Sequence, residues 1–154
     1  MAALKYADLS QNRTSDYEYS PEKMLSLQGN TATYMQYSYA RVSSIFAKGG
    51  FDAAAVRASG AKIVLSDPTE RALGLQLLRL EETLAVVETE AMPHYLTSYL
   101  FDLAKCYSAF FENCSVLKAE NEAVRDSRLL LCDLTARTIR LGLDLLGIKV
   151  VERM

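Results

Sequence analysis

The chain has 154 residues, of which 50% are hydrophobic and 23% are charged, and its formal net charge is −2. This length supports one domain with a proper core and is too short to predict two. The composition excludes an intrinsically disordered chain. No apolar run approaches the roughly 20 residues that span a bilayer, so no membrane partner is expected. The negative charge argues against a protein that coats DNA through phosphate contacts alone.

The three cysteines, Cys106, Cys114 and Cys132, form an odd set without a CxxC pair. This pattern predicts small buried thiols in a reducing compartment rather than disulfide bonds or a structural zinc site. The opening residues, MAALKYADLS, lack the basic region and apolar stretch of a secretory signal. We therefore expect a cytoplasmic protein.

In chain order, the first helix signal comes at Ser20. Before it, the alternating stretch DYEYS predicts a short extended lead-in rather than a helix. Ser20 as N-cap and Pro21 at the first helical position predict a short helix that ends near Leu27. A longer helix is predicted from about Thr31 to Lys48, where Gly49-Gly50 ends it.

The middle of the chain carries the clearest helix start. A modest helix is predicted at DAAAVRAS, and Gly60 ends it. Asp67, Pro68 and Glu70 then have the spacing of a capping box with proline at the first helical position. The sequence that follows predicts either one helix or two that bend at Leu80-Glu81. The stretch AKIVLS is the only candidate strand, and it is too isolated to build a sheet.

Two long helices are predicted in the last third of the chain. One opens at Pro93 and runs to about Asn113. Its apolar stripe, with spacings of three and four, consists of Leu96, Tyr99, Leu103, Tyr107 and Phe110. The other begins near Glu120 and ends at Gly147, before the tail IKVVERM. Its predicted apolar side consists of Val124, Leu131, Leu134, Leu141 and Leu145. The predicted fold class is therefore an all-α helical bundle.

The stretch GNTATYMQYSYARVSSI, residues 29–45, has more large side chains than one core face can take. At 100° per residue, one stripe consists of Met35, Tyr39, Val42 and Phe46. A second stripe, more than about 100° away, consists of Tyr34, Tyr37 and Arg41. The first stripe is predicted to be core. The second has two interpretations: it packs on a neighbouring helix with Arg41 in a salt bridge, or it stacks on unpaired nucleic-acid bases.

No active site is predicted. The only histidine, His94, is expected to be a solvated residue in the first turn of a helix, and no catalytic triad can be built around it. The glycines do not form a phosphate-binding loop. The cluster of glutamates is expected to be a solvated face and consists of Glu81, Glu82, Glu88 and Glu90.

Two long stretches resemble arginyl-tRNA synthetases. KYADLSQNRTSDYEYSPEKMLSLQGNTATYMQYSYARVSSI is similar to the segment that follows their catalytic domain. PHYLTSYLFDLAKCYSAFFENCSVL and RLLLCDLTARTIRLGLDLLGIKVVERM are similar to the rest of their α-helical anticodon-binding domain. From about Phe51 to Glu90 the likeness is in helical pattern. The resemblance implies that residues 1–27 follow an absent catalytic domain and that residues 28–154 are an anticodon-binding domain of the class I synthetase type.

The resemblance also implies a function. The HIGH- and KMSKS-type signatures that bind ATP in this family do not occur here. We therefore expect a part of an arginine–tRNA ligase that binds tRNA without charging it. ATP and Mg²⁺ belong to the parent enzyme, and no cofactor is expected in this fragment. The expected partners are arginine tRNAs, whose anticodons all share a middle C.

Five site residues follow from the resemblance. Tyr34 and Tyr37 match two tyrosines that stack on anticodon bases, and Arg41 matches the arginine one turn later. Phe111 matches a position where the family often has tyrosine, so a side-chain hydrogen bond is lost there while stacking is kept. Met154 matches a closing methionine that lies by the anticodon loop.

Two other functions remain open from the sequence. One is a protein–protein interaction module that docks another subunit through an apolar stripe, which an isoelectric point of 5.5 favours. The other is the anticodon-binding domain of a different class I synthetase, with the same fold but a different anticodon.

Overall fold

The computed structural model of the chain describes residues 1–16 and 20–154, and these residues form helices and connecting loops without a β-strand. The predicted all-α class is confirmed. The helices, in chain order, are α1 (Ala2–Leu9), α2 (Pro21–Met24), α3 (Ala32–Gly49), α4 (Ala53–Ala58), α5 (Pro68–Leu78), α6 (Leu80–Glu90), α7 (His94–Asn113) and α8 (Glu122–Leu145). The extended piece predicted at DYEYS rests on residues 17–19, which lie outside the described residues.

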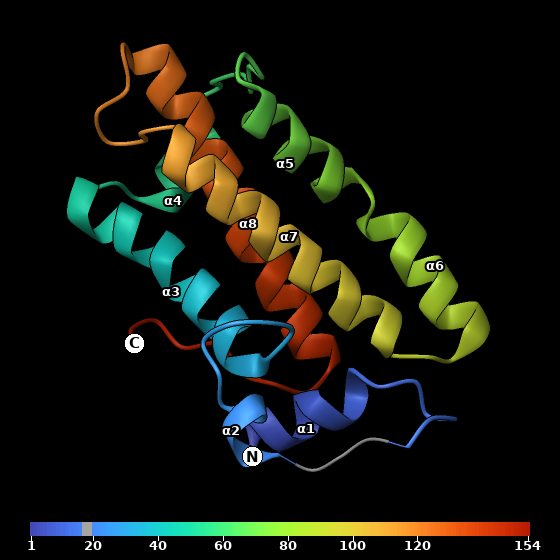
Figure 1. Cartoon of the computed structure of the whole chain (residues 1–154). Helices are drawn as coiled ribbons and strands as arrows, with labels where there is room; N and C mark the ends of the chain where they lie inside the picture. Colours follow the sequence, from blue (N-terminus) through green and yellow to red (C-terminus); the bar gives the residue numbers. More distant parts are fainter. Residues whose placement is uncertain (17–19) are drawn as a thin grey trace.

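The helices pack around α7. In Figure 1, α5 and α6 follow one another along one side of α7, while α3 lies on the other side and α8 runs behind. All five residues of the stripe predicted for α7 are buried in the core. α3 and α8 pack against each other as well as against α7, so the first long helix and the end of the chain lie side by side. None of the helices within the described residues is long and apolar enough to cross a membrane.

Local capping explains why several helices begin where the sequence predicts. Thr31 accepts a hydrogen bond from the Tyr34 amide at the start of α3. Asp67 and Glu70 form the reciprocal capping box of α5, with Pro68 at its first position. The bend that the sequence left open is a real break, since α5 ends at Leu78 and α6 begins at Leu80.

The N-terminal prediction is wrong. Residues Ala2–Leu9 form helix α1 instead of a non-helical lead-in. Tyr6 is fully buried against α3 and α7, and its hydroxyl donates to the Asn30 side chain at 2.7 Å and to the Thr97 carbonyl at 3.2 Å. No capping side chain marks the start of α1, so packing of Tyr6 rather than a local signal stabilises it. Helix α2 also ends earlier than predicted, at Met24.

The apolar side predicted for α8 is also wrong in part. Leu134, Leu141 and Leu145 are exposed, whereas the buried face includes Thr135 and Thr138. These threonines satisfy their hydroxyls on the carbonyl four residues earlier in the helix, which removes the penalty of burying them. The tail after Gly147 is not loose, because Ile148 is buried in the core.

Candidate nucleic-acid interface

The two stripes predicted on α3 have different surroundings. Met35, Tyr39 and Val42 are buried, and Phe46 packs partly buried against the core. Tyr37 lies outside this face with 38% of its surface exposed, compared with 6% for Tyr39. A tyrosine is therefore presented to solvent from the same helix turn that contributes another tyrosine to the core.

Tyr34 lies in the seam between α3 and α7. Its ring meets Phe101 edge-on, with 5.9 Å between the ring centroids. Its hydroxyl lies 3.3 Å from the Ser108 hydroxyl. Tyr34 thus packs on a neighbouring helix, as one of the two sequence interpretations expected, and is partly buried.

Arg41 is held by aromatic rings rather than by a carboxylate. Its guanidinium lies 4.2 Å from the centroid of the Phe111 ring and 5.6 Å from that of Tyr37. It also donates to the Ser108 hydroxyl at 3.3 Å. Within residues 1–16 and 20–154, no carboxylate comes within ion-pair distance of Arg41, so the predicted salt bridge is absent. We call these three side chains the Tyr37–Arg41–Phe111 stack.

Two hollows flank this stack. The tail hollow has a volume of about 580 Å³, and the α7 hollow has a volume of about 670 Å³. Tyr37, Arg41, Ser44 and Lys48 line both of them. Volumes of this size can take a planar ring and its polar substituents.

Different parts of the chain complete the two hollows. The tail hollow is closed by the C-terminal residues Glu152, Arg153 and Met154, and Met154 is 62% exposed. The α7 hollow is bounded by the end of α7 and the loop that follows, including Phe111 and Lys118. Tyr37, Arg41, Phe111 and Met154 therefore surround one surface, while Tyr34 reaches it only through Ser108.

His94 differs from its sequence prediction. It is half-buried instead of solvated, its ring lies 4.3 Å from that of Tyr95, and its buried Nδ1 has no hydrogen-bond partner among the described residues. Within the described part of the chain, no three His, Cys, Asp or Glu side chains come together to hold a metal ion. The residues described here therefore do not fit a Mg²⁺ site.

A comparison with known protein families decides what this fold is. The model of the DALR anticodon binding domain matches residues 35–154. The chain belongs to this family. It is 56% identical over 154 residues to an arginine–tRNA ligase of Rippkaea orientalis and 51% identical to one of Salmonella typhimurium. It spans only 26% of the length of each of these relatives.

Solved structures give the same result for this DALR domain. It is similar to an arginyl-tRNA synthetase of Thermus thermophilus, with a TM-score of 0.89 and 34% identity. It is also similar to one of Plasmodium falciparum, with a TM-score of 0.87 and 36% identity. In both cases 99% of this chain covers 26% of the other. The resemblance drawn from the two ends of the sequence is confirmed.

Several groups around the Tyr37–Arg41–Phe111 stack were not predicted from the sequence. Ser108 touches both Tyr34 and Arg41, and its position three residues before Phe111 on α7 places it on the same helix face. Helical spacing from Phe111 is therefore a signal that finds it. Lys48 lies seven residues after Arg41 on α3 and could be found in the same way. Glu152 gives no such signal, because its partners are distant in sequence.

Proposed function

We propose that this chain binds the anticodon loop of arginine tRNAs as part of an arginine–tRNA ligase. The observation that carries the proposal is the Tyr37–Arg41–Phe111 stack, which lies exposed on a DALR domain and has no carboxylate on its guanidinium among the described residues. Aromatic and guanidinium planes are the surfaces on which splayed-out bases stack. In the core, the same side chains would be covered by apolar neighbours.

The side chains have distinct roles in this proposal. Tyr37 and Phe111 offer ring faces to bases of the loop, and Arg41 supplies both a plane and hydrogen-bond donors. Tyr34 supports them through the Ser108 hydroxyl, which also touches Arg41. Met154 covers a base from the tail side. The two hollows flanking the stack separate neighbouring bases, and one of them receives the middle C.

Catalysis lies outside this role. The family's chemistry uses ATP and Mg²⁺, and the described residues offer neither a metal-ligand group nor a glycine-rich phosphate loop. We assign to the chain a recognition role within a cytoplasmic ligase.

A protein-interaction role has one observation in its favour. Leu134, Leu141 and Leu145 are exposed on α8 with spacings of seven and four residues, which place them along one side of the helix. We call these three leucines the α8 ridge, and none of them lines either hollow. RNA binding that depends on the stack would leave the ridge free for other contacts, so the two roles are separable by mutation.

The decisive experiment compares two tyrosines of one helix. Tyr37→Ala is expected to weaken binding of an arginine-tRNA anticodon stem-loop by about 1–3 kcal/mol, the value of one stacked base, with little change in thermal stability. Tyr39→Ala is the stability control and is expected to cost about 3–5 kcal/mol of folding free energy, because its ring is buried. Isothermal titration calorimetry and thermal denaturation measure the two quantities.

A change of the middle anticodon base tests the specificity of binding. Changing the middle C of the stem-loop to U is expected to weaken binding by about 1–3 kcal/mol, the value of one base's edge contacts. The change is expected to matter less in the Tyr37→Ala protein, because the ring and the base share one contact. Equal melting losses for the two tyrosine variants, together with indifference to the middle base, would remove the proposed function.

A further inference from the structure

The segment after α8 packs against the rest of the molecule. Ile148 is buried in the core, and Val150 packs against the core. The Gln36 side chain of α3 donates to the Lys149 carbonyl at 2.8 Å. These contacts bring the last residues back along α3, toward the exposed tyrosine and arginine of that helix.

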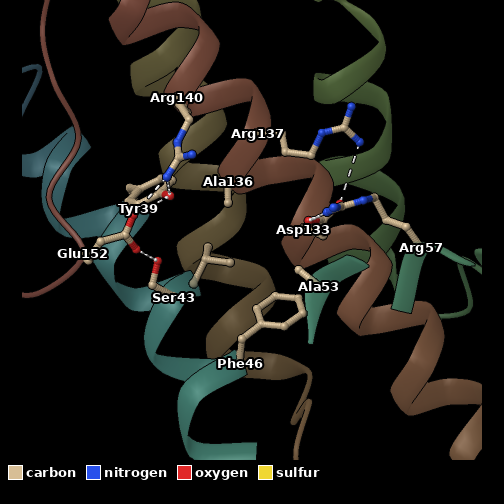
Figure 2. Close-up of a pocket in the computed structure, with 11 residues that line it drawn as sticks. Tyr39, Ser43, Phe46, Ala53, Arg57, Asp133, Ala136, Arg137, Arg140 and Glu152 are labelled. Atoms are coloured by element: carbon tan, nitrogen blue, oxygen red, sulfur yellow. Dashed lines mark hydrogen bonds and ion pairs between the residues drawn. The ribbon is translucent and has the colours of Figure 1, made fainter. Parts of the chain in front are cut away.

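Three donors from two helices converge on Glu152. Its Oε1 accepts from the Tyr39 hydroxyl at 3.1 Å and from the Arg140 guanidinium at 2.9 Å, and its Oε2 accepts from the Ser43 hydroxyl at 3.0 Å. Figure 2 shows the carboxylate on the tail pointing at all three side chains. Tyr39 and Ser43 are one turn apart on α3, whereas Arg140 comes from α8. We call these four side chains the Glu152 clamp.

The donors of the clamp hold one another in place. Arg140 also donates to the Tyr39 hydroxyl, and its guanidinium lies 5.1 Å from the centroid of the Tyr39 ring. Burial raises the pKa of Tyr39, so the hydroxyl stays protonated and able to donate at neutral pH. Both oxygens of Glu152 are therefore fixed, which orients the tail backbone at this residue.

The residues immediately after the clamp, Arg153 and Met154, line the tail hollow together with Tyr37 and Arg41. We propose that the Glu152 clamp is a positioning device that holds Met154 against the base-stacking surface formed by Tyr37 and Arg41. The role given to the clamp rests on the proposed function. It adds Glu152, Arg140 and Ser43 to the residues on which RNA recognition depends, and Glu152 and Ser43 also line the tail hollow.

The clamp predicts an effect opposite in sign to simple electrostatics. Glu152 is negatively charged and lies beside a surface proposed to take a polyanion. Removing that charge should strengthen RNA binding, because it relieves Coulomb repulsion between the carboxylate and the phosphates. If the clamp positions Met154, the same removal weakens binding. Because the Glu152 side chain is 65% exposed and surface ion pairs contribute little to stability, the melting temperature is expected to stay nearly unchanged.

The binding experiment uses the whole chain and an arginine-tRNA anticodon stem-loop. Glu152→Ala and Met154→Ala are each expected to lower affinity roughly fivefold, the value of losing part of one apolar contact. The double variant is expected to be no weaker than the weaker single variant, because both changes remove the same contact. Glu122→Gln, at the far end of α8 from Arg140, is the charge control and is expected to leave binding unchanged or slightly tighter.

A matched variant weakens the clamp without altering charge. Tyr39→Phe with Ser43→Ala deletes two of the three donors and keeps the aromatic ring. It is expected to weaken binding in the same direction as Glu152→Ala. The clamp is overturned if Glu152→Ala binds as tightly as the unaltered chain. It is also overturned if the double variant with Met154→Ala binds roughly 25-fold more weakly, because two independent effects would then add.

A second measurement needs no RNA. In the unaltered chain, the backbone amides of Arg153 and Met154 are expected to have NMR order parameters near 0.85, and in Glu152→Ala these are expected to fall below about 0.6. Unchanged order parameters overturn the clamp by themselves. A different result separates the two proposals. If the order parameters fall as expected but the unaltered chain does not bind the stem-loop, the proposed function is overturned, and with it the role given to the clamp.

Discussion

Tyr37 and Tyr39 stand two residues apart on α3 and have opposite surroundings. Two steps of 100° turn the second side chain about 200° from the first, so one helix turn supplies both a core ring and an exposed ring. Tyr39 uses its buried ring for packing and its hydroxyl for Glu152. Tyr37 lies beside Arg41, and 38% of its surface is exposed. Residue type therefore says little here, whereas helical phase determines the role.

Cysteine reactivity is predicted to follow burial. Burial raises the pKa of all three thiols, that of Cys132 to about 12, and Cys132 is fully buried. Cys106 is only half-buried, so it is expected to react first with a thiol reagent at pH 8, at least tenfold faster than the other two. Time-resolved labelling with a chromogenic disulfide measures the rates. Cys106→Ala is expected to abolish the fast phase, and rapid labelling of Cys132 would contradict this prediction.

Helices are the scale at which the sequence predicted most. The start of α5 is local information, because the Asp67 and Glu70 side chains satisfy backbone amides of the first turn and Pro68 has no N–H to satisfy. Helix α1 carried no such signal, and its stability comes from Tyr6, whose partners Asn30 and Thr97 are 24 and 91 residues away. The buried face of α8 was missed because its threonines satisfy their own hydroxyls, so polarity no longer indicates exposure.

The crossing of α7 and α8 depends on a glycine. A Cβ placed on Gly142 would lie 2.6 Å from the Leu100 side chain, which is fully buried and has no room to move. Gly142→Ala is therefore expected to destabilise the fold by about 1–3 kcal/mol in urea denaturation. Gly74→Ala on α5 is the matched control. Its Cβ would lie 3.2 Å from Leu65, a partly exposed loop residue that can shift, and the gain in helix propensity is about 1 kcal/mol. A stabilised Gly142 variant would refute this account of the crossing.

The junction of α5 and α8 is predicted to be sensitive to acid. The buried carboxylate of Glu70 accepts from the Ser66 and Asp67 amides and from the Arg128 guanidinium at 2.7 Å. Burial by itself would raise the pKa of Glu70, but the hydrogen bonds of Asp67, Arg128 and Ser66 outweigh it and hold the pKa below its ordinary 4.5. The charged form is thus favoured by folding. Its contribution is complete above about pH 4.5 and is lost as pH falls through the lower pKa of the folded state.

Glu70→Gln tests this junction. The variant is expected to lose about 3 kcal/mol of unfolding free energy at pH 7, because Arg128 is left without its buried partner. The difference from the unaltered chain is expected to shrink as pH falls below about 4.5, because Glu70 gains a proton first in the unfolded chain and then, at its lower pKa, in the folded one. Glu122→Gln, on an exposed side chain, is expected to change stability by less than about 0.5 kcal/mol at any pH. A Glu70 difference that is constant with pH would contradict the assignment.

At the scale of the whole molecule, the candidate surface is assembled from α3, the end of α7 and the C-terminal tail. Periodicity on α3 predicted that Tyr34, Tyr37 and Arg41 lie off the core stripe, but it could not show which helix would face them. Phe111 and Met154 came from the family resemblance and not from any pattern in this chain. In sequence, Phe111 lies about 70 positions after Arg41 and Met154 about 113 positions after it. Tertiary packing brings them to one face, and local sequence signals do not reach over such separations.

The charge of this surface predicts that RNA affinity depends only weakly on salt concentration. Four cationic side chains line the two hollows, namely Arg41, Lys48, Lys118 and Arg153. For a single-stranded loop, each neutralised phosphate contributes about −0.7 to the slope of log affinity against log salt, so the slope is expected to be no steeper than about −3. Fluorescence anisotropy of a labelled stem-loop across a range of salt concentrations measures it. Lys118→Ala is expected to flatten the slope by less than about 1 without changing preference for the middle base, since a phosphate contact carries no base information. A slope much steeper than −3 would contradict the proposed surface, because it would require more phosphate contacts than these four cations can make.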